Sequence, residues 1–500
     1  MTHCLSVLHD LVWGAPALLM ILGVGIYLSI RTGFAQLRFF PKAMKVFFCR
    51  IFQRETSVDG VSSFQALCTA LAATVGTGNL VGVAGAICLG GPGSIFWMWI
   101  CGILGMITKF AEVSLAVHYR VRESGEWIGG PMYMISRGMG KHWKWLAKCY
   151  CLFGVIAAFG VGNATQVNAV LSGINSVLSG FGYYTGLRRN IAVGILLAVL
   201  VGAMLLGGAK RIGLAAERLI PFVSLFYILL CTGILLLRLK ELPAAFSTIV
   251  RGAFTPRAVT GGMIGSSFRA LRVGCSRGVF TNEAGMGTAS IAHASAGIVH
   301  PVEQGLMGIV EVFLDTIVIC TLTALVILAS GVPIPYSMDA GGQLTIAAFV
   351  QVYGDWVSIA ITAALCCFAF ATVLGWGLYG ARCAQFLFGS KAWNIFALLQ
   401  TATVLLGSVL NTQTVWLFAE TVNGLMALPN LIALAALSPV LIRLTKEYRK
   451  SNGKAVSGGN YADFYQRKPL RALSYAEIPS SGNCSQERGK KDLSSEHRSA

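Results

Sequence analysis

Apolar stretches of about 20 residues or more follow one another along nearly the whole chain, and no other feature constrains its fold as strongly. They lie near residues 11–30, 64–89, 93–118, 150–180, 190–208, 215–237, 262–298, 305–331, 355–381, 393–410 and 413–442. A helix needs about 20 apolar residues to cross a bilayer. Strands of a membrane barrel would instead alternate apolar and polar residues over about 10 positions. The pattern therefore predicts an all-α polytopic membrane protein with about 11 transmembrane helices.

The composition excludes several other classes of protein. Charged residues make up 12% of the chain and hydrophobic residues 55%, whereas soluble domains carry about 25% charged residues. The net charge of +18 comes from residues between the apolar stretches and in the last part of the chain, without aromatic stacking motifs, so nucleic acid is excluded as a partner. The spacings of a metal site or a membrane metalloprotease are absent from the sequence. We therefore expect no enzyme and no covalent cofactor.

The positions of the basic residues predict how the chain crosses the membrane. With 11 spans and the N-terminus outside, 28 of the 39 Lys and Arg residues fall in inside segments and 6 in outside segments. This bias follows the positive-inside rule, and its weakest point is the outside loop 238–261, with four basic residues. Residues 1–10 contain no Lys or Arg, so the first apolar stretch is expected to be a retained helix rather than a cleaved signal peptide. The C-terminus is then inside.

Two of the apolar stretches contain sequence that does not suit a continuous helix. Residues 72–82 read AATVGTGNLVG, and residues 277–288 read RGVFTNEAGMGT. Each has a Gly-x-Gly pair beside hydroxyl and amide side chains, and glycine weakens a helix by about 1 kcal/mol relative to alanine. Backbone freed in a membrane must be buried in protein or line a polar cavity. We therefore expect two broken spans, one in each half of the chain.

The two breaks occupy equivalent positions in an internal repeat. If the first span is set aside, the other ten form two groups of five, and each group begins with a broken span. Because five is odd, the second group enters the membrane from the opposite side, which gives a 5+5 inverted repeat. The expected units are residues 1–63 (an extra helix and a basic loop), 64–237, 238–442, and a disordered cytoplasmic tail, 443–500.

Several motifs resemble one known family. They are Thr74-Val75-Gly76-Thr77-Gly78-Asn79, Gly129-Gly130-Pro131-Met132-Tyr133, Gly160-Val161-Gly162-Asn163, Asn282-Glu283-Ala284-Gly285-Met286-Gly287, Gly375-Trp376 and Met426-Ala427-Leu428-Pro429-Asn430. Over residues 60 to 445 the chain resembles the alanine/glycine:cation symporters, also called sodium:alanine symporters. The resemblance implies the inverted-repeat fold of sodium-coupled amino-acid transporters with one added N-terminal helix.

The resemblance also implies a substrate site at the two breaks. Backbone N–H groups near Thr77 and Gly78 would bind the substrate carboxylate, with the dipole of a helix N-terminus adding to the attraction. Groups near Phe280, Thr281 and Asn282 would bind the ammonium group, and Glu283 would hold it directly or organise the break. The full set of expected substrate-binding residues is Thr77, Gly78, Asn79, Asn163, Gln166, Phe280, Thr281, Asn282, Glu283, Gly285, Thr372 and Trp376.

A sodium site is implied by the same resemblance. Its expected ligands are the carbonyls of Ala72 and Val75 and the hydroxyl of Thr372. The preceding position usually carries a hydroxyl residue in the family, but this chain has Ala371. Proton coupling therefore stays open as an alternative.

Charged residues inside spans are functional candidates. Lys109 and Glu112, three apart on one span, are expected to pair. Three arginines before the second break (Arg269, Arg272 and Arg277) are expected to line a vestibule or its gate, with Glu311, Asp315 and Glu420 as possible partners.

The sequence thus predicts a secondary active transporter in a bacterial or archaeal inner membrane. It would couple a cation, sodium first, to uptake of a small neutral amino acid, alanine or glycine, by alternating access. Its expected partners are that substrate and membrane lipid, with no obligate protein partner. The alternatives are a proton-coupled transporter of the same substrates and a non-transporting amino-acid sensor that uses the tail.

Overall fold

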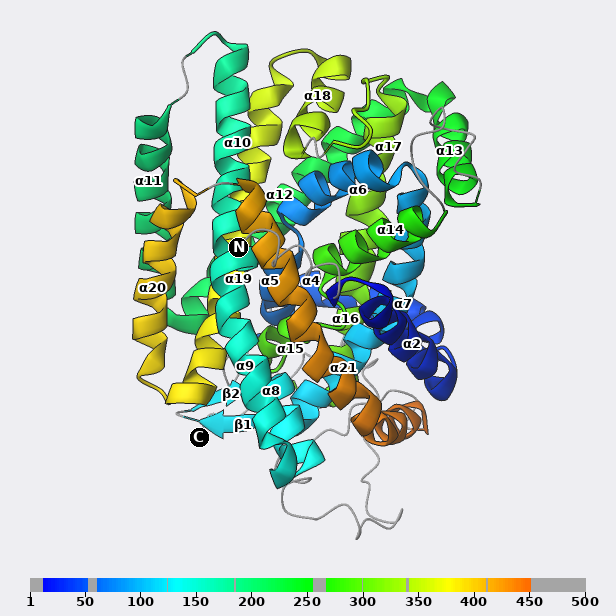
Figure 1. Ribbon diagram of the computed structural model, residues 1–500. Helices are drawn as coiled ribbons and strands as arrows, with labels where there is room; N and C mark the ends of the chain where they lie inside the picture. The colour runs from blue at the N-terminus through cyan, green and yellow to red at the C-terminus, as the bar shows by residue number, and fades with distance from the viewer. Residues whose placement is uncertain are drawn as a thin grey trace, which may run out of the picture.

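The computed structural model describes residues 12–52, 61–123, 125–183, 186–254, 267–298, 300–338, 341–410 and 412–450. The expected features at 1–10, at 255–261 within the loop 238–261, and beyond Lys450 lie outside these residues. The described chain is a bundle of helices with one short antiparallel strand pair at its lower end, β1 (Val121–Glu123) and β2 (Glu126–Ile128), in which Val121 pairs with Ile128 (Figure 1).

The helices follow one another in this order: α2 (Ala15–Thr32), α3 (Ala35–Arg38), α4 (Phe40–Phe52), α5 (Ser63–Thr74), η1 (Gly78–Gly82), α6 (Val83–Gly90), α7 (Gly93–Tyr119), α8 (Pro131–Tyr133), η2 (Met134–Met139), η3 (Lys141–Trp143), α9 (Lys144–Phe159), η4 (Gly160–Ala164), α10 (Thr165–Gly180), α11 (Leu187–Leu205), α12 (Gly208–Leu237), η5 (Leu239–Glu241), α13 (Leu242–Phe254), α14 (Ser267–Asn282), α15 (Thr288–His293), α16 (Pro301–Val312), η7 (Phe313–Cys320), α17 (Thr321–Ala329), α18 (Gly341–Tyr353), α19 (Val357–Phe388), α20 (Ala392–Gly407) and α21 (Thr412–Lys450). The last helix therefore continues eight residues past position 442, where the tail was expected to begin.

Within the described residues, seven helical stretches are long and apolar enough to cross a membrane. They are Gly93–Tyr119, Lys141–Gly180, Leu187–Leu205, Gly208–Leu237, Pro301–Ala329, Val357–Phe388 and Leu417–Lys450. The bent pair Ser63–Thr74 and Gly78–Gly90 makes an eighth, and Pro16–Thr32 and Ala392–Gly407 are shorter apolar helices. The chain is therefore a multi-pass membrane protein.

Helices α11 and α20 pack against each other at one edge of the bundle (Figure 1). Leu196 on α11 and Leu398 on α20 are each 60% exposed, as suits a surface that faces lipid. At the centre, α7 packs against α14 and α16, while α5 packs against α12, α15 and α19. The broken helices are therefore enclosed on several sides by continuous ones.

Both interruptions predicted from the sequence are confirmed. Helix α5 ends at Thr74, and after a turn the chain resumes as η1 and α6, bent by 47° from α5. Helix α14 ends at Asn282, and α15 begins at Thr288. Between them Glu283, Gly285 and Gly287 have φ values of 54°, 97° and 77°, which no right-handed helix accommodates. Glycine supplies two of these conformations without strain.

Several spans also contain wider π-helical turns, which the sequence analysis did not predict. One, η4, joins α9 to α10, and another, η7, joins α16 to α17. Such turns occur frequently at functional sites because they break the regular ladder of backbone bonds. Both η4 and η7 contribute residues around the two breaks, as described below.

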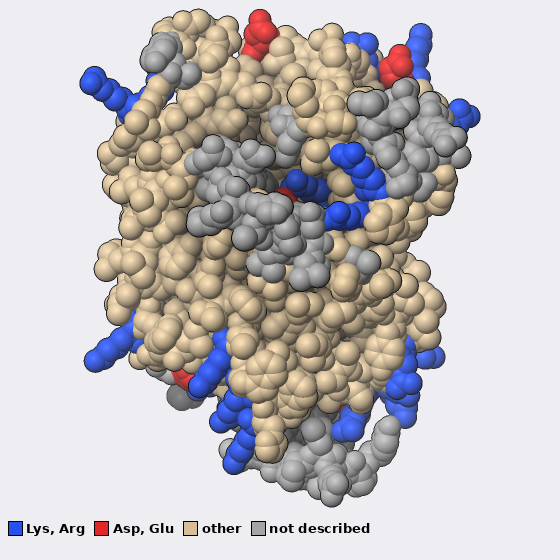
Figure 2. Space-filling model, viewed as in Figure 1, with Lys and Arg blue, Asp and Glu red and all other residues tan. Residues whose placement is uncertain are grey.

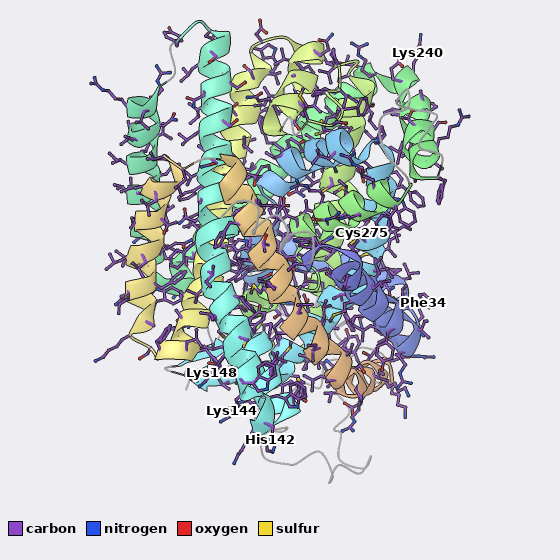
Figure 3. All side chains as sticks on the ribbon, viewed as in Figure 1. Phe34, His142, Lys144, Lys148, Lys240 and Cys275 are labelled. Atoms are coloured by element: carbon purple, nitrogen blue, oxygen red, sulfur yellow. The ribbon has the colours of Figure 1, made fainter. Side chains whose placement is uncertain are left out.

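The two ends of the bundle differ in their basic residues. His142, Lys144 and Lys148 lie at the lower end, with the strand pair, whereas Lys240 lies at the opposite end (Figure 3). The lower end is the one expected to face the cytoplasm.

Candidate functional site

A small cavity lies where the two breaks face each other. Its walls come from the first break, the second break, η4, α10 and α19. The lining residues are Ala73, Thr74, Gly76, Thr77, Gly78, Val161, Gln166, Phe280, Glu283, Thr372 and Trp376. Seven of these belong to the substrate-binding set expected from the sequence: Thr77, Gly78, Gln166, Phe280, Glu283, Thr372 and Trp376.

The first break is closed by Asn79. The Gly76 N–H donates to Asn79 Oδ1 at 2.9 Å, and the Asn79 N–H donates to the Gly76 carbonyl at 3.3 Å. Thr77 reaches across the cavity wall, where its hydroxyl donates to Gln166 Oε1 at 3.0 Å. These bonds fix the backbone of the turn in the shape that the cavity requires.

Glycines bring the two breaks together. A Cβ atom at Gly78 would lie 3.0 Å from Thr281 Cγ2 in the second break, and a Cβ at Gly76 would collide with the Thr372 hydroxyl on α19. Likewise, a Cβ atom at Gly162 in η4 would collide with the Cβ of Trp376. Side chains at these positions would push the walls apart, which is a packing reason for glycine at each.

Glu112 on α7 holds the second break. Its Oε1 accepts from the N–H groups of Gly285 and Gly287 at 2.8 and 3.1 Å, and from Asn430 Nδ2 at 2.7 Å. Asn430 also donates to the Gly285 carbonyl at 2.9 Å. A carboxylate is therefore matched by three donors in a place where helical backbone bonds are missing.

Asp315 in η7 connects the two breaks. Its Oδ1 accepts from Asn79 Nδ2 at 2.7 Å, and its Oδ2 accepts from the Thr316 hydroxyl at 2.8 Å. The Thr316 hydroxyl in turn accepts from Asn282 Nδ2 at 3.0 Å. One buried chain of bonds thus joins Asn79 in the first break to Asn282 in the second.

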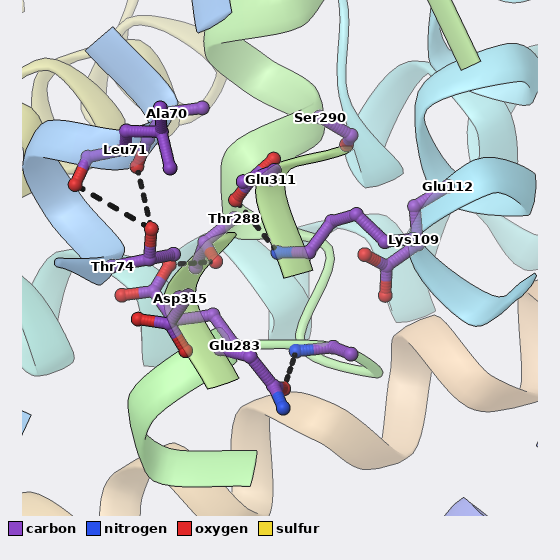
Figure 4. Close-up of polar contacts among 12 residues, drawn as sticks. Ala70, Leu71, Thr74, Lys109, Glu112, Glu283, Thr288, Ser290, Glu311 and Asp315 are labelled. Carbon is purple, nitrogen blue, oxygen red and sulfur yellow. Dashed lines mark hydrogen bonds and ion pairs between the residues drawn. The ribbon is translucent and has the colours of Figure 1, made fainter. Parts of the chain in front are cut away.

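Five titratable side chains gather beside these bonds, from α7, the second break, α16 and η7: Lys109, Glu112, Glu283, Glu311 and Asp315 (Figure 4). The expected pair of Lys109 with Glu112 is wrong. Lys109 Nζ lies 3.3 Å from Glu311 Oε1, with both side chains fully buried, while Glu112 binds the backbone of the break. Spacing along one helix did not decide the pairing, because α16 packs directly against α7.

Glu283 differs from the other carboxylates because it lines the cavity. Its backbone is left-handed, with φ of 54°, an uncommon conformation for a residue other than glycine. Its Oε2 accepts from the Thr288 hydroxyl at 2.5 Å. Strain of this kind at a cavity wall is characteristic of functional positions.

Five expected site residues lie behind the wall rather than on it. Asn79 and Asn282 make the bonds just described, Gly285 binds Glu112 and Asn430, and the Thr281 hydroxyl donates to the Gly278 carbonyl at 2.8 Å. Asn163 was expected on the same face as Gln166, but its Nδ2 donates to the Gln400 carbonyl on α20 at 2.7 Å. Asn163 lies in η4 and is not among the residues that line the cavity.

Two of the three expected sodium ligands, Ala72 on α5 and Thr372 on α19, are in contact. The Thr372 hydroxyl donates to the carbonyl of Ala72 at 3.0 Å, and to that of Phe368 on its own helix at 3.0 Å. Val75 follows α5 in an extended conformation, with ψ of 96°. Its carbonyl therefore does not point along the helix axis as the carbonyls of α5 do. Ala371 is buried and contributes no side-chain oxygen.

The three arginines of α14 lie at the upper half of the bundle. Figure 2 shows basic side chains over α14 beside a hollow in the surface. Arg277 forms an ion pair with Glu420 on α21, and the Glu420 carbonyl accepts from Trp13 Nε1 at 2.7 Å. Of the partners expected for the arginines, Glu420 thus pairs with Arg277, whereas Glu311 pairs with Lys109.

Comparison with known proteins identifies the group to which this arrangement belongs. The model of the sodium:alanine symporter family matches residues 1–460. This chain belongs to the sodium:alanine symporter family. It is therefore a transporter, a symporter by family, and not an enzyme.

Individual relatives agree with the family model over most of their length. An uncharacterized transporter of Haemophilus influenzae is 44% identical over 449 residues, which is 89% of this chain and 95% of that protein. The sodium/alanine symporter AgcS of Methanococcus maripaludis is 42% identical over 456 residues, 90% of this chain and 98% of that protein. The crystal structure of MhsT in complex with L-phenylalanine shares the fold, with a TM-score of 0.52, 14% identity, and coverage of 78% of this chain and 99% of that one.

Two functional groups of this symporter could not be assigned from the sequence. Asp315 was expected only as a partner for arginine, and Asn430 only as part of a family motif. Both are polar residues inside apolar stretches, which is a usable signal, but their partners come from spans far away in the sequence.

Proposed function

We propose that this protein is a sodium-coupled importer of small neutral amino acids, alanine or glycine, in the inner membrane of a prokaryote. The observation that carries the proposal is the cavity between the two breaks, with a carboxylate, Glu283, on one wall and the buried turn Gly76–Gly78 on the other. An amino acid has one cationic and one anionic group, and this cavity offers a partner of opposite charge or dipole to each.

The carboxylate of the substrate would bind the first break. The chain turns there from α5 into η1, and N–H groups at the start of a helical segment attract anions. The substrate ammonium would bind Glu283, since a buried carboxylate gains strongly from an opposite charge nearby. Gln166 and Thr77, which bond to each other, would complete the wall.

The size of the substrate would be limited by packing. Phe280 and Trp376 line the cavity, and the Trp376 ring rests against Gly162 without space for a methyl group between them. Larger side chains would need the indole to move. This supports alanine or glycine rather than bulkier amino acids.

Sodium would bind beside the substrate site. The Thr372 hydroxyl and the carbonyls of Ala72 and Val75 are oxygen donors, which hard cations prefer. Ala371 supplies no oxygen, so a water molecule would complete the shell. This same feature supports the second candidate, proton coupling.

For the whole chain we propose about 11 membrane spans, with the N-terminus outside and the C-terminus inside. Residues 64–237 and 238–442 would form the two inverted five-helix repeats. The sites of the two breaks, one in each proposed repeat, support this division.

The test is uptake of labelled L-alanine and glycine by proteoliposomes under a sodium gradient, a proton gradient, or neither. Accumulation driven by sodium supports the proposal, and accumulation driven by protons alone favours the second candidate. Glu283→Gln keeps the shape of the side chain but removes its charge, and we expect uptake to fall at least about tenfold. Glu241→Gln, at an exposed position in η5, is the matched control and should transport normally. Unchanged uptake by Glu283→Gln would contradict the assigned ammonium site.

A further inference from the structure

A second cavity adjoins the substrate cavity between α10, α11, α19 and α20. Apart from Gln166, the described residues that line it are apolar: Val167, Val170, Leu197, Val201, Ala369, Phe370, Val373 and Val404. By itself this space is about the size of a water molecule. A buried water needs several polar partners, which such a lining does not supply. Hydrocarbon groups are the atoms that would fill this space favourably.

Gln166 on α10 is the one described residue that lines both cavities. Its side chain is held by hydrogen bonds: Oε1 accepts from the Thr77 hydroxyl at 3.0 Å, and Nε2 donates to the Val161 carbonyl at 3.0 Å and to the Thr165 hydroxyl at 3.4 Å. Thr77 and Val161 both line the substrate cavity. The polar end of Gln166 is therefore bound to the walls of the substrate cavity, and its side chain separates that cavity from the apolar one.

Trp376 forms another wall of the substrate cavity, but packed atoms lie behind it. A side chain at Gly162 would collide with the Trp376 Cβ, and the indole ring packs edge-on against Tyr379 with the ring centroids 5.8 Å apart. Both aromatic side chains are fully buried. Shortening Trp376 would leave a hole in packed surroundings, whereas shortening Gln166 would open the substrate cavity into space that is already there.

The proposed site binds an amino acid by its two charged groups. The first break takes the carboxylate and Glu283 takes the ammonium group, so the side chain faces the walls that remain, Gln166 and Trp376 among them. Alanine places a single methyl group there. A longer side chain can enter only where a wall yields to free volume, and Gln166 is the wall with free volume behind it.

We propose that Gln166 is a specificity-determining residue that restricts this transporter to small amino acids, and that the apolar cavity behind it is a latent pocket for a longer hydrocarbon or thioether side chain. This inference rests on the proposed function. Gln166→Ala removes Cγ, Cδ, Oε1 and Nε2 and joins the two cavities. L-methionine extends beyond alanine by Cγ, Sδ and Cε, so its flexible, unbranched chain needs no more atoms than the substitution removes.

The test is binding of L-methionine by the purified full-length protein in detergent with sodium, measured as an increase in thermal stability. Competition against the uptake of labelled L-alanine by proteoliposomes is the second readout. L-alanine should stabilise the unmodified protein, and L-methionine should not. In Gln166→Ala, the apparent affinity for L-methionine relative to L-alanine should rise at least about tenfold, as expected when a pocket accepts apolar groups that it had excluded.

Matched variants separate the partition from its hydrogen bonds. Gln166→Met keeps the length of the side chain but loses the amide bonds to Thr77 and Val161, so alanine uptake should fall without any gain for L-methionine. Ala369→Leu, added to Gln166→Ala, fills the joined space from α19 and should abolish the gain. Ala369 is buried and lines the second cavity. Gln166→Ser also removes the partition but keeps a hydroxyl group, so it should show the same gain and replaces Gln166→Ala if that variant does not fold.

The outcomes distinguish this inference from the proposed function. Stabilisation of the unmodified protein by L-alanine, with no gain for L-methionine in either shortened variant, would overturn the inference alone. An equal gain in Gln166→Met, or strong binding of L-methionine by the unmodified protein, would do the same. If the unmodified protein neither binds nor imports alanine or glycine, the proposed function fails and this inference fails with it.

Discussion

At the scale of single residues, a buried polar group is stable only where its neighbours supply its hydrogen-bond partners. His300 precedes α16 and lies just outside the span, with 2% of its surface exposed. Its Nδ1 accepts from the Val302 N–H at 3.1 Å, which caps the helix. Burial, together with the nearby Lys42 and His118, lowers the pKa of His300 to about 4. The cap therefore depends on a neutral imidazole.

This dependence predicts a loss of stability in mild acid. The folded-state pKa of about 4 is below the unfolded value of about 6.5, so the unfolded chain binds more protons in that window. Stability then falls as the pH drops from about 7 to 5, by about 1–2 kcal/mol from this residue. In His300→Asn, which can still cap the helix, thermal unfolding in detergent should vary less with pH. An equal pH dependence in both proteins would show that His300 does not contribute.

At the scale of elements, the second break is held in place by specific contacts and is not simply a weak stretch of helix. Gly287 has φ of 77°, and a Cβ there would lie 2.6 Å from Asn430 Oδ1 and would also collide with Pro131. The break is thus held by its own conformation and by α7, α8 and α21 around it. Any side chain at this position must displace Asn430, which also holds Glu112 and Gly285.

A pair of glycine substitutions separates strain from packing. Gly331, after α17, has φ of 80°, but a Cβ there meets nothing within 4 Å. Gly331→Ala should cost about 1–2 kcal/mol of stability from the left-handed backbone alone. Gly287→Ala adds the collision with Asn430, so we expect a larger loss of thermal stability and a fall in alanine uptake of at least about tenfold. Equal effects of the two substitutions would contradict the role given to Asn430.

At the scale of the whole molecule, transport requires that the cavity open to each side in turn. The pair of Arg277 and Glu420 joins α14, which leads into the second break, to α21, which crosses the bundle (Figure 1). Both side chains are 12% exposed. We expect this pair to hold α14 and α21 together when the upper side of the cavity is closed.

Charge reversal tests whether this contact matters for the cycle. Arg277→Glu and Glu420→Arg should each reduce sodium-driven uptake, because each places like charges against one another. The double exchange restores opposite charges and should recover a substantial part of the activity, as a coupled pair requires. If uptake by the double variant is no higher than uptake by the less active single variant, the two residues act separately.

The sequence by itself determined the class of fold and the places where it breaks. The length of an apolar stretch is a property of contiguous residues, and Gly-x-Gly in the middle of a span marks backbone that leaves the helix. Both features can therefore be recognised from the sequence alone. The family motifs then pointed to residues of which seven line the cavity. Thr372 and Ala72, which the resemblance placed in one sodium site, are in contact between α19 and α5, and the sodium site itself stays a prediction.

Only the tertiary structure decided which polar groups meet. Lys109 bonds to Glu311 rather than Glu112, Asn163 bonds to Gln400 and does not line the cavity with Gln166, and Asp315 joins the two breaks. These partners lie on different helices, far apart in the sequence. In a low-dielectric interior a buried charge is stable only beside the particular groups that packing brings to it, and packing is a property of the whole fold.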